Sequence, residues 1–301
     1  MRTILPGGLA LFILSFWCPL LPAQQPVELP IDGIFKRLQQ YDPLSVDIET
    51  DVRSLKSGKR EKTWQPAVFK IMQGKTAVYE QKVQIAVRGN MRRKTCDFPP
   101  VKIRFFEQDM ENDSLEDVNE LKLVVGCRNS SSDDQLVLRE CLAYELYNIL
   151  TEESFRVKLA KVRIKNPGSR RGMESTAFFI ESERELAARL GGKPIKPRVI
   201  SPKAMDTLAY DRMCVFEFMI GNTDFSTYGR HNVKVLAFKS RQVLPVPYDF
   251  DYSGLIDADY AVPGPTIPIP DVHHRYYLGL CRRPDQLNRV FKLFLEKKAQ
   301  I

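Results

Sequence analysis

The stretch VQIAV at residues 83–87 alternates apolar side chains with polar or small ones, which is the period of a strand that buries one face. Comparable runs on both sides of it indicate that this half of the chain is mainly β-structure. Between two of the runs, an acidic segment at 107–120 reads as a solvated loop. The predicted strands of this half are residues 44–49, 67–72, 83–87, 101–106, 121–125, 157–164 and 176–181.

Helical spacing of apolar residues marks three other segments. The first, at residues 138–150, carries an apolar stripe on one face, and Asp133 or Asp134 can cap its N-terminus. The second spans residues 202–220, and the third begins at Pro284. The stripe predicted for the first helix consists of Leu138, Leu142, Leu146, Ile149 and Leu150.

The C-terminal part combines helices with a hairpin and a proline-rich stretch. Strands predicted at 233–238 and 242–247 form the hairpin. The prolines at 263–270 exclude regular secondary structure, so this stretch is either a substrate-docking segment or a polyproline strap. We expect an α+β protein with a β-rich N-terminal lobe at 44–181 and a helical C-terminal lobe at 182–301 that carries the hairpin.

The N-terminal 23 residues have the features of a secretory signal peptide. Arg2 supplies a positive charge, residues 9–21 are apolar, and Ala23 is a small residue at the cleavage position. An uncleaved membrane anchor is the alternative, but prolines and glycines leave only a short apolar helix. We expect a signal peptide at 1–23, a linker and short helix at 24–43, and export to the periplasm, the cell envelope or the medium.

The charge balance favours an anionic partner. Lys and Arg number 45 against 37 Asp and Glu, and the formal net charge of +8 is spread along the chain. The 3 histidines argue against a multi-histidine metal site. The basic turn at 166–171 has no aromatic residue for base stacking, so nucleic acid is not an expected partner. We also expect a monomer without a stable membrane span, because no segment after the leader has the ~18 apolar residues that a span needs.

Five cysteines follow the predicted leader, and none is spaced as C-x-x-C, which argues against zinc-ribbon and thioredoxin-like sites. Cys141 and Cys214 fall within helical apolar patterns and are expected to be buried thiols. Export permits disulfides, and a bridge between Cys96 and Cys127 is an alternative that the sequence leaves open. Cys281 is the remaining thiol.

Polar residues with metal-binding chemistry gather around the predicted hairpin. Asp224 lies in the loop after the 202–220 helix, and Asn232 opens the first hairpin strand. Asp249 and Asp251 follow the second strand, and a strand begins beside the end of its antiparallel partner. Carboxylate and carboxamide oxygens suit Mg²⁺, and phosphoryl transfer uses such groups to neutralise a triphosphate. The alternative is that these residues only cap helices, form turns or face solvent.

Several short segments follow one another in an order that one protein family shares. Arg88-Gly89-Asn90, a basic proline-containing stretch and the strand VKIRF at 101–105 come first. The helix at 138–150, FIE at 179–181, the Asn222-x-Asp224 loop, Asn232 and YDFD at 248–251 follow. The arrangement resembles the spore-coat protein H (CotH) kinase family, whose signature reads RGN…PKKSYRIKF. This resemblance covers roughly residues 80–255 and implies an atypical protein-kinase-like bilobal fold with ATP bound between the lobes.

The resemblance also implies a role for each matched residue. Lys102 and Arg104 lie two positions apart on one predicted strand face, and either could reach the ATP phosphates. The implied roles are catalysis for Asp224, Mg²⁺ binding for Asn232, Asp249 and Asp251, and nucleotide binding for Arg88, Lys102, Arg104 and Glu181.

We therefore expect an exported atypical kinase that transfers a phosphoryl group from Mg-ATP to a hydroxyl of a protein, a glycan or another acceptor. The sequence departs from the family at Pro99-Pro100, where paired lysines are usual, and at Tyr248, where Trp is usual. It also contains no glycine-rich phosphate-binding loop. These departures favour the alternative of a catalytically inactive kinase-like binding or envelope-assembly protein, and a small-molecule or sugar kinase is a third interpretation.

Overall fold

The computed structural model of the chain describes residues 33–59, 61–89, 91–105, 120–128, 130–197, 199–239 and 242–301. The chain divides into two units, Met1–Ile31 and Asp32–Ile301, and every element named below belongs to the second. The predicted signal peptide at 1–23, the linker that follows it, the acidic loop except Glu120, and Asn90 all lie outside the described residues.

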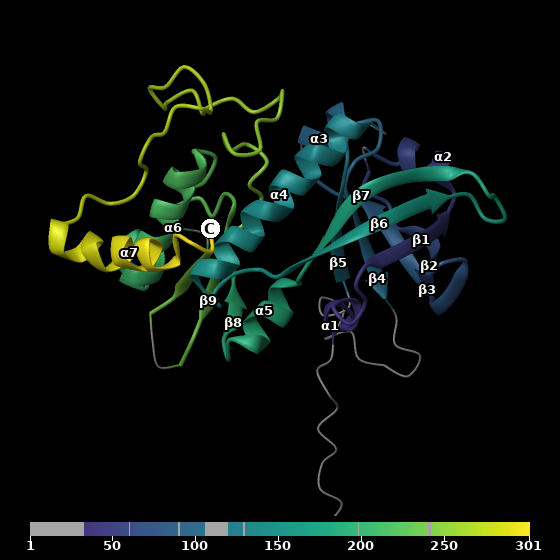
Figure 1. Cartoon of the computed structure of the whole chain (residues 1–301), viewed down its shortest axis with the longest axis horizontal. Coiled ribbons are helices and arrows are strands. Elements are labelled where there is room, and N and C mark those ends of the chain that lie inside the picture. The colour runs from purple at the N-terminus through teal and green to yellow at the C-terminus, as the bar shows by residue number, and fades with distance from the viewer. Residues whose placement is uncertain are drawn as a thin grey trace, which may run out of the picture. The chain divides into compact units, whose positions relative to one another are not determined.

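Seven strands close into a barrel in the order β1-β2-β3-β4-β5-β7-β6 (Figure 1). Neighbouring strands are antiparallel except β1 and β6, which run parallel with Val46 opposite Val162. A ring that contains an odd number of alternating strands must include one parallel pair. The strands are β1 Leu44–Thr50, β2 Gln65–Gln73, β3 Thr76–Val87, β4 Val101–Phe105, β5 Glu120–Val125, β6 Val157–Lys165 and β7 Gly172–Ile180.

Alternate side chains of every barrel strand fill the interior and form one hydrophobic cluster. On β5, Leu121, Leu123 and Val125 point inward, whereas Lys122 and Val124 occupy the alternate, outward positions. The ring of Phe69 is fully buried and packs edge-on against Phe105, at a centroid distance of 5.0 Å. The barrel is therefore a filled core and leaves function to its outer surface and its ends.

The helix α4, Ser131–Leu150, connects β5 to β6 and lies against β7, which separates those two strands (Figure 1). Outward-pointing Val124 and Phe178 pack beneath it, with the Phe178 ring 5.7 Å from that of Tyr144. The cap of α4 is Ser130 and not the predicted Asp133 or Asp134. The predicted leucine stripe is correct only in part, since Leu150 is buried and Leu146 packs against the core, but Leu142 is 47% exposed. The rest of the buried face carries Val137, Glu140, Cys141, Tyr144 and Tyr147.

The remaining elements surround a second, three-stranded sheet with the order β10-β9-β8. The predicted hairpin is confirmed, with Pro247 opposite Val233. Residues 248–283, all of them described, contain neither helix nor strand. The elements are α1 Ile34–Leu38, α2 Val52–Ser57, α3 Met91–Thr95, α5 Glu183–Arg189, β8 Lys193–Ile195, a 3₁₀ turn at Pro202–Ala204, α6 Thr207–Ile220, β9 Val233–Ala237, β10 Leu244–Pro247 and α7 Pro284–Lys297.

The predicted kinase-like bilobal fold is wrong. The N-terminal half is a closed barrel, and the C-terminal half is not a helical lobe, because it consists of a small sheet, three helices and a long irregular segment. A second hydrophobic cluster is shared by α4, β5 and β7 on one side and α6, β9 and β10 on the other. Local periodicity located the strands but could not reveal the pairing between β1 and β6, which are more than 100 residues apart.

The structure also bears on the predictions about the cysteines and about membrane-spanning helices. Cys96 and Cys127 form a disulfide, and Cys141 and Cys214 are buried thiols as predicted. Within the part of the chain that the structure describes, no helix has the length and apolar character required to cross a bilayer.

Replacing Phe69 with Ala should lower the free energy of unfolding by about 3–5 kcal/mol, because it empties a packed site at the centre of the barrel. Urea unfolding followed by circular dichroism measures the loss. Leu142→Ala, at an exposed position on α4, serves as the control and should change the value by less than about 0.5 kcal/mol. A loss below about 1 kcal/mol for Phe69→Ala would contradict the filled-barrel description.

Candidate functional site

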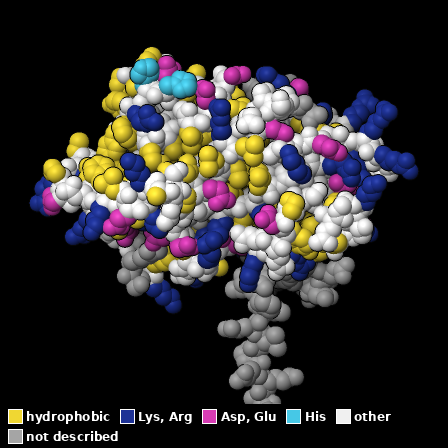
Figure 2. All heavy atoms as spheres, in the orientation of Figure 1, with side chains coloured by type: hydrophobic (Ala, Val, Ile, Leu, Met, Phe, Trp, Pro, Cys, Tyr) yellow, Lys and Arg dark blue, Asp and Glu magenta, His cyan; other side chains and the backbone are white. Residues whose placement is uncertain are grey.

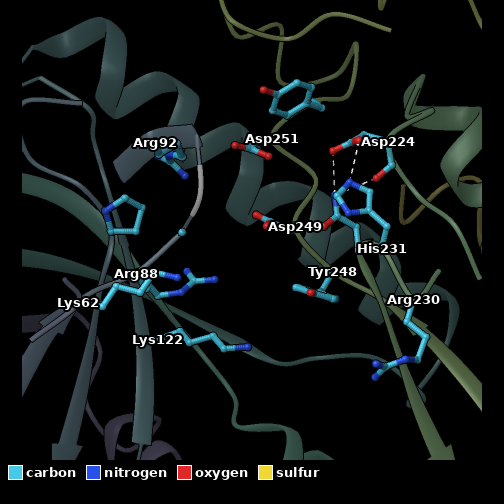
Figure 3. Close-up of a pocket in the computed structure, with 14 residues that line it drawn as sticks. Lys62, Arg88, Arg92, Lys122, Asp224, Arg230, His231, Tyr248, Asp249 and Asp251 are labelled. Carbon is cyan, nitrogen blue, oxygen red and sulfur yellow. Dashed lines mark hydrogen bonds and ion pairs between the residues drawn. The ribbon is translucent and has the colours of Figure 1, made fainter. Parts of the chain in front are cut away.

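A cavity of about 490 Å³ lies between the barrel and the irregular segments of the C-terminal half (Figure 3). Its barrel side carries cations, namely Lys62, Arg88, Arg92 and Lys122. Its other side carries Asp224, Asn232, Asp249 and Asp251, together with His231 and the cation Arg230. Opposite charges therefore face each other across one cavity.

Asp224 is held by a short loop that starts where α6 ends. Gly221 closes the helix with φ +69°, a left-handed conformation that glycine adopts without strain. Asn222 is fully buried, and its Nδ2 donates to Glu217 Oε2 at 2.9 Å while its Oδ1 accepts from the Asp224 backbone N–H at 2.9 Å. Burial raises the pKa of Glu217 to about 8. The hydrogen bonds of this buried pair therefore fix the backbone position from which the Asp224 side chain extends.

The Asp224 carboxylate has two side-chain partners. Asn232 Nδ2 donates to Asp224 Oδ2 at 3.0 Å and to its backbone carbonyl at 2.8 Å. His231 Nε2 lies 2.9 Å from Asp224 Oδ1 (Figure 3). Burial raises the pKa of Asp224, and the contact with His231 opposes that rise. The carboxylate is thus oriented but still reachable from the cavity.

The hairpin brings Asn232 beside the segment that follows β10. Tyr248 N–H donates to the Asn232 carbonyl at 3.1 Å, and Asp249 N–H donates to Tyr144 Oη at 2.9 Å. Arg230, Asn232 and Asp249 all have φ between +51° and +65°, which is costly for residues other than glycine. Such conformations concentrate at functional sites, where the surrounding contacts impose them.

Asp251 lies near Asp249 and Asp224 in a largely buried position. Its Oδ2 accepts a hydrogen bond from Tyr260 Oη at 2.9 Å. Burial and the negative charge of Asp249 raise the pKa of Asp251 to about 6, and Arg92 opposes this rise. Carboxylates that repel one another in this way would be stabilised by a cation between them.

The barrel side has two kinds of cation. Arg92 is committed to structure, since it forms an ion pair with the buried Glu140 at 3.1 Å and donates to the Val125 carbonyl at 2.9 Å. Burial raises the pKa of Glu140, and Arg92 lowers it. Arg88 and Lys122, in contrast, have no carboxylate within ion-pair distance among the described residues, and Figure 3 shows both pointing toward the aspartates.

Lys122 and Lys234 both lie against the Tyr248 ring, at 5.4 and 5.0 Å from its centre. Burial, together with the nearby charges of Arg88 and Lys234, lowers the pKa of Lys122 to about 7. Three cations crowded together without a full set of counter-ions form an attractive place for a polyanion.

A second cavity of about 700 Å³ adjoins the first and shares Lys122 with it. Lys234 and Glu183, which form an ion pair at 3.3 Å, line it, together with Ser182, Ala187 and Pro194. Elsewhere on the face seen in Figure 2, Lys and Arg side chains are interspersed with Asp and Glu.

The structure brings together five of the residues singled out from the sequence, namely Arg88, Asp224, Asn232, Asp249 and Asp251. The other three do not line this cavity. Lys102 and Arg104 share a face of β4 as expected, but they lie against the Trp64 ring and Glu120. Glu181 is buried and forms an ion pair with Arg189 at 2.9 Å.

Sequence reasoning missed several residues of the site, above all Lys122 and His231. Lys122 lies on β5 directly opposite Lys102 on β4, so the expected strand lysine is present one strand further along. The signal that could have found Lys122 is its outward position in the alternating run ELKLVV. His231 was visible in the sequence beside Asn232, and only its 2.9 Å contact with Asp224 shows its place.

The chain matches no protein-family model and no curated protein. The resemblance to the CotH family therefore stays a prediction, and the function is inferred below from the geometry of the cavity.

The stability of the protein should rise with pH above 7 because of Lys122. Its pKa is about 7 in the folded chain and about 10.4 in an unfolded one, so between these values only the unfolded chain holds the proton. One such proton contributes at most about 1.4 kcal/mol per pH unit. Urea unfolding at pH 7, 8 and 9 should show a smaller rise for Lys122→Met than for the wild type.

Lys102→Met, which removes the lysine opposite on β4, is the matched control and should keep the wild-type pH dependence. Equal slopes for Lys122→Met and the wild type would show that Lys122 is protonated throughout this range.

Proposed function

We propose that the protein is a phosphotransferase that moves a phosphoryl group from Mg-ATP to a hydroxyl of a protein, a glycan or another acceptor. The observation that carries the proposal is the single cavity in which Asp224, Asp249 and Asp251 face Arg88 and Lys122. Phosphoryl transfer depends on positioning and on neutralising charge, and these are the two things that such a cavity supplies.

The cations of the barrel side are suited to the phosphates. Arg88 and Lys122 are available for new partners, and Lys234 lies near Lys122 against the same Tyr248 ring. A bound phosphate would raise the pKa of Lys122 and keep it charged, because it compensates the burial and the neighbouring cations that now lower that pKa. Binding the polyphosphate therefore relieves an unfavourable arrangement of charge.

The aspartates of the other side are suited to Mg²⁺. No three His, Cys, Asp or Glu side chains of the described residues converge in a way that would hold a metal ion by themselves. Mg²⁺ commonly uses one or two carboxylates and completes its shell with waters and substrate phosphates. Asp249 and Asp251, with the Oδ1 of Asn232, fit an ion that arrives with the nucleotide, where it would neutralise charge on the phosphates.

Asp224 is the residue proposed to act on the acceptor. Its carboxylate is held by Asn232 and His231, so it can accept a hydrogen bond from an incoming hydroxyl in a fixed direction. As that oxygen attacks the phosphorus, its proton passes to a carboxylate oxygen of Asp224. The buried pair of Asn222 and Glu217 keeps the loop from moving during this step.

The second cavity offers room for the nucleoside. It adjoins the first at Lys122, and its wall includes the apolar side chains of Ala187 and Pro194 as well as the Ser182 hydroxyl. A nucleotide whose phosphates lie at Lys122 could extend its base and sugar into this space. The disulfide and the predicted leader both support the proposal that the protein acts after export.

A catalytically inactive binding protein is the second candidate. It is favoured by one observation, that the carboxylates of the described residues do not by themselves complete a metal site. The experiment below separates the two candidates, because binding and turnover are measured in the same samples.

Mg-ATP should raise the melting temperature of the wild-type protein by several degrees at saturation, since a ligand that binds only the folded state stabilises it. Asp249→Ala should lose this rise. Asp224→Asn should keep it and lower phosphate transfer by at least about 100-fold, because it removes the proton acceptor. Differential scanning fluorimetry and transfer of labelled γ-phosphate to the protein or to added acceptors measure the two effects.

Asp259→Ala is the matched control, because Asp259 lies on the same segment but is exposed and outside the cavity. It should keep both binding and transfer. Absence of any Mg-ATP effect on the wild type contradicts the proposal, and binding without transfer supports the second candidate.

A further inference from the structure

The loop between β3 and β4, residues 88–100, supplies a large part of the barrel side of the cavity. Arg88, Gly89, Arg92 and Pro100 all line the cavity. The two ends of the loop are joined, since the Arg88 backbone N–H donates to the Pro100 carbonyl at 2.8 Å. Gly89 has φ +88°, where a side chain would be strained, and this lets the chain turn directly after Arg88.

A disulfide fixes this loop from outside. Cys96 is bonded to Cys127, which lies between β5 and α4, and Phe98 N–H donates to the Cys127 carbonyl at 3.2 Å. Cys96 N–H in turn donates to the Arg92 carbonyl at 2.9 Å, so the bridge lies one helical turn from Arg92. The loop is thereby tied to the strand that carries Lys122.

Arg92 completes a closed ring of contacts. Its guanidinium donates to the carbonyl of Val125, two residues before Cys127, and forms an ion pair with Glu140 on α4. These contacts form a closed path. It runs along the chain from Arg92 to Cys96, across the disulfide to Cys127 and back to Val125, whose carbonyl accepts a hydrogen bond from the Arg92 side chain. Besides the bridge, this loop is held by hydrogen bonds, the Arg92–Glu140 ion pair and the packing of Phe98 in the barrel core, and the bridge is the covalent one of these links.

Repulsion between two cations of the cavity is the reason that the bridge matters for binding a polyphosphate. Arg88 on the loop and Lys122 on β5 repel each other, as the lowered pKa of Lys122 indicates. A loop that is free to move would carry Arg88 away from Lys122, and a polyphosphate would then have to bear the cost of bringing it back. A covalent link removes that cost before the ligand arrives.

We infer that the Cys96–Cys127 bridge holds a polyphosphate-binding loop in its binding conformation. The oxidised protein presents Arg88 and Lys122 together, and reduction of the bridge lowers the affinity of the protein for a polyphosphate. The inference deepens the proposed function, on which its nucleotide part rests, whereas its anion part can be tested with inorganic tripolyphosphate alone.

Among the described residues a reductant has one bridge to act on. A dithiol breaks the S–S bond with two electrons and two protons, so that Cys96 and Cys127 become thiols and the dithiol becomes a cyclic disulfide. The other described cysteines carry no bridge, since Cys141, Cys214 and Cys281 are all free thiols. An effect of the reductant therefore belongs to this one bond.

The experiment is calorimetric titration of tripolyphosphate, and separately of Mg-ATP, into the oxidised protein, the reduced protein and the Cys96→Ala/Cys127→Ala variant. We expect the dissociation constant of each ligand to rise at least 10-fold on reduction and in the double variant, with an unchanged circular dichroism spectrum. Cys281→Ser, which removes the exposed free thiol, is the control and should respond to reductant as the wild type does.

If folded reduced protein binds tripolyphosphate as tightly as oxidised protein, the inference is wrong, and the proposed function stands on its Mg-ATP result. If oxidised protein binds tripolyphosphate but not Mg-ATP, the proposed function fails, and the inference stands provided that reduction weakens tripolyphosphate binding. If oxidised protein binds neither ligand, both fail.

A second variant covers the case in which loss of the bridge unfolds the protein. Arg92→Gln leaves the disulfide intact but breaks the ring of contacts, and it should weaken tripolyphosphate binding by a factor similar to that of reduction. Lys94→Gln, at an exposed position on the same loop and outside the cavity, is its control and should bind normally. Wild-type affinity in folded, oxidised Arg92→Gln would overturn the inference.

Discussion

The parallel pairing of β1 with β6 is the constraint on which the rest of the structure depends. It closes the sheet, sends alternate side chains into a common interior and leaves the others on the outside. Two of these outward residues lie on β5, where Val124 packs in the second hydrophobic cluster and Lys122 reaches the cavity. Because the same short strand anchors that cluster and carries the cation, the position of Lys122 relative to the aspartates follows from hydrophobic packing.

The aspartate side of the cavity could be predicted from the sequence because its geometry is local. Asn232 and Asp249 meet through a short hairpin, and the loop that carries Asp224 begins where a recognisable helix ends. The cation side could not, because it depends on strands that pair at long range. Lys102 and Lys122 are neighbours on adjacent strands, and only the tertiary structure shows which of them reaches the cavity.

The helix α4 illustrates a second limit of sequence reasoning. Its buried face carries Glu140 and Tyr144 beside apolar residues, so the predicted leucine stripe matches that face only in part, with Leu150 buried but Leu142 exposed. Both polar groups are buried because they serve the site, Glu140 by holding Arg92 and Tyr144 by accepting from Asp249. Hydrophobic periodicity fails where buried polar groups are needed, and closure of the barrel was equally invisible because it joins segments far apart in the chain.

The cavity lowers the stability of the folded protein, because like charges are crowded in it and because Arg230, Asn232 and Asp249 have positive φ angles. The closed barrel offsets this cost and has a further consequence. Among the described residues every strand of that sheet pairs with a neighbour on each side over at least part of its length, so no strand has one side left wholly open to a strand of another molecule. A chain shortened by its first strand would expose β2 and β6 together, and its failure would be self-association.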